Sequence, residues 1–444
     1  MKHLVPVIDV FAGPGGLSEG FSAIGKREGK PYFRIALSIE KDKYAFETLL
    51  LRSFFRQFPH GKVPEEYYEY LRGEMGWDTL FSIAKKRYYY QWIMSRNEAW
   101  HAALGSGREF DDELDSRIMD ITRKKDKWVL IGGPPCQAYS IIGRARNSGI
   151  SHYNPENDER THLYKEYLKI LCKHKPAIFL MENVKGILSS KLNGERIIDK
   201  IINDLENPSM FDGKYGEVSY RIFSLVKNEN GYDDPNFKEH NPFDFVIECE
   251  KFGVPQRRHR VILLGIREDL CKKPRPGILE ESGTYNLQDV IGGLPVLRSG
   301  LSREDDSAEA WERNLRQALS TGSWLNEIIQ VAGKPVYREI KRTLFRLQKP
   351  EKDRGGNFIA YAHSNGNIFS DWFADQRIGG VCNHSSKAHM IEDIYRYLYA
   401  SSFGIIYKRS PKLDEFPTYL LPEHENVNTG DFKDRFRVQV WDQP

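Results

Sequence analysis

The cysteine at position 136 lies in a short segment whose composition favours a reactive thiol. Residues 132–140 read Gly-Gly-Pro-Pro-Cys-Gln-Ala-Tyr-Ser and follow the apolar run 128–131, which has the pattern of a buried strand. Prolines fix the backbone of the turn, and the carboxyl end of such a strand opens onto a ligand crevice in α/β proteins. Most unpaired cysteines are small core residues, and we interpret Cys172 and Cys249 in that way. Cys136 is instead predicted to do chemistry.

Two other segments place polar side chains where strands are expected to end or begin. Glu182 follows the apolar run 177–181, and Gln256, Arg258 and Arg260 precede the apolar run 261–265. If this second segment is extended, these three side chains point to one side. Each segment alone has an ordinary alternative, a surface glutamate or a salt-bridged basic face. Taken together, they predict that a thiol, a carboxylate and arginines converge at one edge of a sheet.

A glycine-rich turn near the N-terminus predicts a site for a nucleoside-bearing cofactor. Residues 9–17 read Asp-Val-Phe-Ala-Gly-Pro-Gly-Gly-Leu and lie between a strand pattern and a helix pattern. Glycines at such a turn let a ligand approach the backbone, and the helix that follows offers free N–H groups. Glu40 ends the next predicted strand, where an acidic side chain accepts hydrogen bonds from ribose hydroxyls. These residues do not distinguish a dinucleotide from S-adenosylmethionine.

Alternating strand and helix patterns in the first half predict the elements that position these residues. Helix patterns include 163–174 and 195–205, and apolar runs typical of strands lie at residues 5–11, 34–39, 128–131, 177–181, 220–225 and 261–265. We therefore expect an α/β fold with a Rossmann-like, doubly wound and mostly parallel sheet. The long interval 51–127 between two of the strand patterns predicts a helical insertion.

The length of 444 residues predicts more than one domain. We expect a catalytic domain at residues 1–270, a hinge rich in proline and glycine at 271–300, and a second, smaller and irregular domain at 301–444. Residues 334–354 contain eight basic and three acidic side chains. This pattern fits either a surface that contacts nucleic-acid phosphates or a solvated basic helix.

The overall composition excludes some classes of protein and leaves others open. A formal charge of +3 neither requires nor excludes a nucleic-acid partner. Five widely spaced cysteines without a Cys-x-x-Cys pair predict no disulfide framework and no metal site. The chain begins without an apolar leader and contains no run of 18 apolar residues, so we expect a cytoplasmic protein with no membrane partner.

Four blocks resemble, in order, the signature blocks of the C5-cytosine-specific DNA methyltransferases. They are Phe-Ala-Gly-Pro-Gly-Gly at 11–16, Gly-Pro-Pro-Cys-Gln at 133–137, Glu-Asn-Val at 182–184 and Gln-Arg-Arg-His-Arg at 256–260. The resemblance covers residues 4 to about 300. It implies DNA methylation of the kind found in restriction-modification systems, with double-stranded DNA as the substrate.

The resemblance also implies a role for each residue of the predicted catalytic group. Cys136, as a thiolate, would attack C6 of a cytosine that is flipped out of the duplex. Glu182 would bind the N3 edge of the base and supply a proton there. Arg258 and Arg260 would orient the base, and residues 138–149 would form a loop that closes over it.

The same resemblance implies S-adenosylmethionine as the methyl donor. Phe11 would stack on the adenine, Glu40 would bind the ribose, and Pro134 and Leu163 would line the methionine end. The rest of the expected cofactor site is the glycine-rich turn itself, with Gly13, Gly15, Gly16 and Leu17.

An acidic residue at the third strand is expected to meet the adenine amino group. Glu74, in the sequence Gly-Glu-Met, is our prediction for this residue, and Asp120, in Met-Asp-Ile, is the alternative.

Blocks that the resemblance leads us to expect after the recognition region are not found in residues 301–444. These are a Thr-Ile-Thr strand, an Arg-x-Leu-Thr helix and a final Gly-Asn-x-Val segment. We therefore expect a truncated or split enzyme, with a second polypeptide supplying the missing blocks. Two other interpretations stay open at this point. One is a tRNA cytosine-5 methyltransferase, and the other is a DNA-binding remnant without catalytic activity.

Overall fold

The computed structural model divides the chain into two compact units, which are described separately. It describes residues 4–25, 29–123, 127–135, 163–192, 195–227, 241–271, 276–318, 320, 323–350, 353–362 and 369–421. The first unit contains residues 1–67 and 77–284, and the second contains 68–76 and 285–444. The division at 284/285 lies inside the segment expected to be a hinge.

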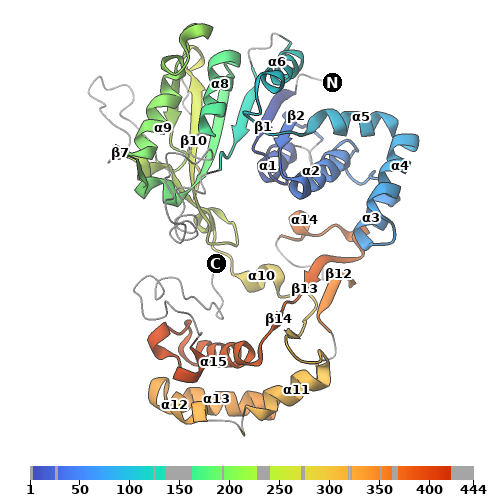
Figure 1. The fold of residues 1–444 in the computed structure, drawn as a ribbon, viewed down its shortest axis with the longest axis vertical. Helices are drawn as coiled ribbons and strands as arrows, with labels where there is room; N and C mark the ends of the chain where they lie inside the picture. The colour runs from blue at the N-terminus through green and yellow to red at the C-terminus, as the bar shows by residue number, and fades with distance from the viewer. Residues whose placement is uncertain are drawn as a thin grey trace. The chain divides into compact units, whose positions relative to one another are not determined.

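A mostly parallel sheet forms the centre of the first unit (Figure 1), as the sequence predicts. Its strand order is β3-β2-β1-β4-β5-β10-β8, with β9 paired to β10. The strands are β1 (Val5–Val10), β2 (Phe33–Glu40), β3 (Ala99–His101), β4 (Val129–Gly132), β5 (Ile178–Val184), β8 (Tyr220–Phe223), β9 (Val246–Glu248) and β10 (His259–Arg267). Strand β10 runs antiparallel to both β5 and β8. The order reverses between β1 and β4, and ligands of such sheets bind at this switch point.

Helices cover both faces of the sheet. One face carries the larger core, in which α8 (Tyr164–His174) and α9 (Ile197–Glu206) bury Tyr167, Leu171 and Ile198 against the strands (Figure 1). On the other face, α1 (Gly16–Ala23) packs Leu17 and Phe21 against a smaller group of strand residues. Burial of these apolar faces is the main force that holds the helices on the sheet.

The interval between β2 and β4 contains a strand that the sequence prediction missed. It holds α2 (Lys43–Arg56), α3 (Glu65–Arg72), α4 (Trp77–Arg87), α5 (Tyr89–Glu98), β3 and α6 (Arg108–Thr122). The third strand of the sheet is β3, which pairs in parallel with Ser38–Glu40 of β2. The prediction of the third strand at Gly73-Glu74-Met75 is therefore wrong. Three residues are too few to show a strand period.

The second unit is largely helical and has its own core. Its longer helices are α11 (Ala308–Gln317), α12 (Ser323–Val331), α13 (Gly333–Phe345) and α15 (Ile391–Tyr407). They bury a common apolar cluster that includes Trp324, Ile340 and Tyr399. Helix α13 contributes Val336, Ile340 and Leu344, a spacing of four that places them on one face. The prediction of an irregular second domain was therefore wrong for these residues.

Short elements complete the second unit. Strands β12 (Gly355–Ala360) and β13 (Gly380–Ser385) form an antiparallel pair, and β11 (Gly300–Leu301) pairs in parallel with β14 (Ala388–His389). The helices α10 (Leu287–Ile291) and α14 (Ser370–Phe373) are about one turn long. In the part of the chain that the structure describes, no helix is both long enough and apolar enough to cross a membrane.

Candidate active site

The glycine-rich turn after β1 has a backbone that few residue types can adopt. Phe11, Gly13 and Gly15 have positive φ angles of 58°, 57° and 95°. A Cβ atom on Gly15 would lie only 2.9 Å from Cδ1 of Leu49, so this position has both a conformational and a steric need for glycine. Phe11 is half-buried and packs against the larger core. Its left-handed backbone marks a strained position of the kind found at ligand sites.

Glu40 ties the end of β2 to this turn. Its Oε2 accepts a hydrogen bond of 2.8 Å from the backbone N–H of Gly13, and its Oε1 accepts one of 2.6 Å from Asp42. The backbone N–H of Ala12 also donates to the carbonyl of Ile39, at 3.0 Å. A carboxylate has about four lone-pair sites, so Glu40 retains the capacity to accept hydroxyl donors. The cofactor residues expected on the turn and on β2 thus lie at one end of adjacent strands.

Glu182 lies where three neighbouring strands bring the predicted catalytic segments together. Its strand β5 pairs with β4 on one side, with Met181 opposite Gly132, and with β10 on the other, with Glu182 opposite Ile262. A Cβ atom on Gly133 would be 2.9 Å from Oε2 of Glu182, so any larger residue here would displace this carboxylate. Gly133 is three residues before Cys136, which itself lies outside the described residues.

Arg260 supplies the positive charge beside Glu182. Its Nε lies 2.6 Å from Oε1 of Glu182, and the two side chains are 19% and 27% exposed. Among the described residues the Nε–H has no hydrogen-bond acceptor, so the contact is an ion pair, and Nη1 donates a hydrogen bond to the carbonyl of His259 at 2.8 Å. In a partly buried site this attraction keeps the guanidinium close to the carboxylate.

The segment before β10 is folded rather than extended, which corrects one prediction. The N–H of Gln256 donates to the carbonyl of Val254 at 2.7 Å, and the N–H of Arg258 donates to that of Gln256 at 2.8 Å. Hydrogen bonds over two residues define successive γ-turns. The prediction of a plain extended segment is therefore wrong, and the shared face of Gln256, Arg258 and Arg260 stays a prediction. Arg258 is exposed, and of these arginines only Arg260 pairs with Glu182 among the described residues.

Sequence reasoning missed Asp9, which is fully buried under the turn. Its Oδ2 accepts a hydrogen bond from the hydroxyl of Ser18, in the first turn of α1. Burial raises the pKa of Asp9 to about 7, although the hydrogen bond from Ser18 acts in the opposite direction. The available signal was an acidic residue inside the otherwise apolar run 5–11.

The other residues predicted for the cofactor site lie on α1, after β4, before α8 and after α3. Gly16 and Leu17 begin α1, Pro134 is buried just after β4, and Leu163 is half-buried at the start of α8. Glu74 follows α3 in the segment that belongs to the second unit, where it pairs with Arg72 at 2.7 Å. The whole of the expected loop 138–149, like all of residues 136–162, lies outside the described residues.

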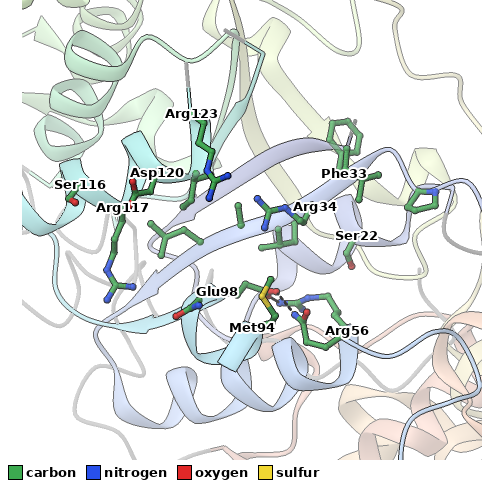
Figure 2. A pocket seen from close by; sticks show the side chains of 18 of the residues that line it. Ser22, Phe33, Arg34, Arg56, Met94, Glu98, Ser116, Arg117, Asp120 and Arg123 are labelled. Atoms are coloured by element: carbon green, nitrogen blue, oxygen red, sulfur yellow. Dashed lines mark hydrogen bonds and ion pairs between the residues drawn. The ribbon is translucent and has the colours of Figure 1, made fainter. Parts of the chain in front are cut away.

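A cavity of about 860 Å³ lies at the other end of β2. It is lined by residues 33–37 of β2 and by side chains of α5 and α6, among them Arg34, Glu98, Asp120 and Arg123 (Figure 2). Glu40 and the glycine-rich turn do not line it. Asp120, the alternative to Glu74, thus lies on α6 beside this cavity rather than at the end of a strand.

Comparison with known proteins gives the chain's relationships. A type II methyltransferase of Bacillus paralicheniformis is 31% identical over 310 residues, which are 66% of this chain and 61% of that protein. A type II methyltransferase of Desulfomicrobium norvegicum is 24% identical over 70% of this chain and 53% of its own length. A DNA (cytosine-5-)-methyltransferase of Aeropyrum pernix is 33% identical over 33% of this chain and 28% of its own length. The match thus spans less than two thirds of each relative.

A family model gives the broader assignment. The model for the C-5 cytosine-specific DNA methylases matches residues 89–215 and 239–355, which are more than half of the chain. The matched ranges include Glu182, Arg260 and the segment that contains Cys136. The chain therefore belongs to the C-5 cytosine-specific DNA methylase family.

Proposed function

We propose that this chain is a DNA (cytosine-5-)-methyltransferase that transfers a methyl group from S-adenosylmethionine to C5 of cytosine in double-stranded DNA. One observation carries the proposal. The carboxylate of Glu182 lies against Gly133, three residues before Cys136, and is paired with Arg260. The described segment that precedes the proposed nucleophile thus meets the proposed proton donor and its positioning cation at one edge of the sheet.

The residues at the cofactor end fit an adenosine-containing ligand. Glycines at 13 and 15 leave the backbone of the turn open, and Glu40 presents a carboxylate whose orientation two backbone N–H groups fix. Phe11 offers an aromatic face beside them. S-adenosylmethionine, when bound, supplies the electrophilic methyl group. Phe11, Glu40 and the turn would hold it, with Pro134 and Leu163 as further predicted contacts.

The chain's own residues account for the activation of cytosine. Cys136, as a thiolate, would form a bond to C6 of the ring while the ring electrons shift toward N3. Glu182 pairs with Arg260 as a carboxylate, so it would first take up a proton from water. It would then give that proton to N3 as negative charge develops there, with Arg260 beside it. C5 then becomes nucleophilic enough to accept a methyl group. Loss of the C5 proton to a base and expulsion of the thiolate would restore the aromatic ring.

The second unit carries a basic helix face that supports contact with DNA. On α13, Lys334, Arg338 and Lys341 are exposed and form no ion pair among the described residues. Phe345, on the same helix, is 86% exposed. Exposed cations on one helix face are the kind of surface that contacts nucleic-acid phosphates. The cytosine must leave the base stack to reach Cys136, which requires base flipping.

Trapping on a modified duplex tests the proposal. Fluorine at C5 of the target cytosine cannot leave as a proton does, so the adduct with the enzyme persists. The full chain with S-adenosylmethionine and such a duplex should give a covalent complex, detectable by mass. Cys136→Ser should give none, whereas Cys271→Ser, a matched change at a half-buried free cysteine, should behave like the unchanged protein.

The outcomes separate the proposal from its alternatives. An adduct that excess tRNA but not excess duplex DNA suppresses would favour the tRNA methyltransferase. Absence of calorimetric binding to S-adenosylmethionine would favour the non-catalytic remnant. An adduct that survives Cys136→Ser would reject Cys136 as the nucleophile. The second polypeptide and the cytoplasmic location stay predictions.

A further inference from the structure

Three buried polar groups connect the elements around the glycine-rich turn. Asp9 on β1 accepts a hydrogen bond from Ser18 on α1, and the Ser18 hydroxyl lies 3.5 Å from that of Ser38 on β2. All three side chains are at most 1% exposed. The Oδ1 atom of Asp9 is buried and has no hydrogen-bond donor in the described structure. Asp9, Ser18 and Ser38 therefore support the glycine-rich turn on its buried side. Glu40 holds the turn through the N–H of Gly13.

Two charged side chains, on α2 and β2, act on the carboxyl group of Asp9. Arg56 on α2 is the cation that favours the ionised carboxylate, and Glu40 on β2 disfavours it. Tyr167 on α8 also faces Asp9 but stays neutral, because burial raises its pKa well above the ordinary value. The neighbouring strand β4 contributes only apolar side chains beside Asp9. Asp9 thus responds to charge at Glu40, the residue that we propose binds the ribose.

This electrostatic coupling has a consequence for ligand choice. S-adenosylmethionine carries a sulfonium cation, whereas S-adenosylhomocysteine, which remains after methyl transfer, has a neutral thioether. A cation bound at the turn favours ionised Asp9, and a neutral ligand does not. Conversely, ionised Asp9 must favour the cation by the same factor, because the two equilibria are linked.

We propose that Asp9, which is buried beneath the glycine-rich turn with Ser18 and Ser38, is a positioning residue that makes the turn prefer the cationic cofactor over its neutral product. The inference rests on the proposed function, because it assumes that this turn binds S-adenosylmethionine. It assigns Asp9 a role in exchanging product for fresh cofactor, beyond the packing of β1 against α1.

Calorimetric titration of the full chain with each ligand at pH 6 and pH 8 tests the inference. The preference is the dissociation constant of S-adenosylhomocysteine divided by that of S-adenosylmethionine. We expect it to rise by about threefold to tenfold between pH 6 and pH 8, since one unit of pKa change corresponds to tenfold. In Asp9→Asn, which mimics the neutral acid, this rise should be absent from the preference after subtraction of any change that comes from the ligands. The ligands' own amino groups titrate in the same way with either protein, so the difference between the two proteins isolates the contribution of Asp9.

Two further variants complete the design. Glu47→Gln removes a partly exposed carboxylate that pairs with Lys43, and it should keep the pH dependence. Ser18→Ala removes the hydrogen bond that favours ionised Asp9, so it should move the rise in preference to higher pH. A preference that rises equally in Asp9→Asn and in the unchanged protein would overturn the inference. If neither ligand binds at either pH, the proposed function fails instead.

Discussion

Replacing Asp9 with asparagine should stabilise the first unit more at pH 8 than at pH 5. The carboxyl group is fully buried, and its pKa is raised to about 7 from an ordinary value of 3.8, chiefly by burial. In the unfolded chain the same group ionises near 3.8, so the unfolded state gains from ionisation over a range in which the folded state does not. Its contribution to stability is therefore fully present below pH 3.8 and is lost as pH rises toward 7.

The size of the effect follows from the two pKa values. Each unit of pKa difference corresponds to about 1.4 kcal/mol, and between pH 5 and pH 8 the buried carboxyl group costs the fold roughly 2 to 3 kcal/mol. Asparagine cannot ionise and escapes this loss. Its amide group leaves donors without acceptors, which costs about 1 to 3 kcal/mol at every pH. The two proteins differ in free energy of unfolding at every pH. Only the part of this difference that changes with pH therefore reports on the carboxyl group of Asp9.

Urea titrations at pH 5 and pH 8, followed by hydrogen exchange of the β1 amides, measure this change without interference from the second unit. The stability difference between Asp9→Asn and the unchanged chain should shift toward the variant by roughly 2 to 3 kcal/mol from pH 5 to pH 8. Glu47→Gln serves as the control and should show no such shift. A difference independent of pH would refute a raised pKa for Asp9.

Three other changes test separate parts of the site. Glu40→Gln places an amide where two backbone N–H groups need an acceptor. Affinity for S-adenosylmethionine should therefore fall at least tenfold, about 1.4 kcal/mol or more. An unchanged affinity by calorimetry would show that Glu40 is not part of the cofactor site. Arg260→Met leaves Glu182 without its cation and should slow adduct formation on the fluorinated duplex at least tenfold, whereas Arg257→Met, at an exposed neighbour, should not. Arg338→Glu combined with Lys341→Glu should reduce the salt dependence of duplex binding by a slope of about two and leave cofactor affinity unchanged; an unaltered slope would show that α13 does not contact phosphates.

Long, periodic elements were the predictable part of the fold. The runs at 5–11, 34–39 and 261–265 became β1, β2 and β10, because buried strands of five or more residues carry a clear apolar signal. The three-residue β3 carries no such signal, and its position depends on α5 delivering the chain to the edge of β2. The second unit was predicted as a separate domain, but its helices were missed for another reason. Its helices bury apolar faces against one another, and no single helix shows this pairing in its own sequence.

The candidate site was predictable in its segments but not in its contacts. The pattern of glycines and prolines around Cys136, and the positions of Glu182 and Arg260 near strand ends, indicated which segments would meet. The γ-turns at residues 254–256 and 256–258 were not predicted, because the pattern of polar and apolar residues does not distinguish them from an extended segment. Asp9 was overlooked because a single acid in an apolar run shows its burial only once three elements enclose it.

The short third strand has a consequence for how this protein behaves at high concentration. Because β3 pairs only with Ser38–Glu40, residues 33–37 of β2 have no strand beside them on that side in the described structure. An open strand edge invites pairing with other molecules and thereby aggregation. Here α5 and α6 flank the edge of β2, and Arg34 and Arg123 line the cavity described above (Figure 2). An incoming strand would have to displace water from both arginines, which disfavours pairing with another molecule at this open part of β2.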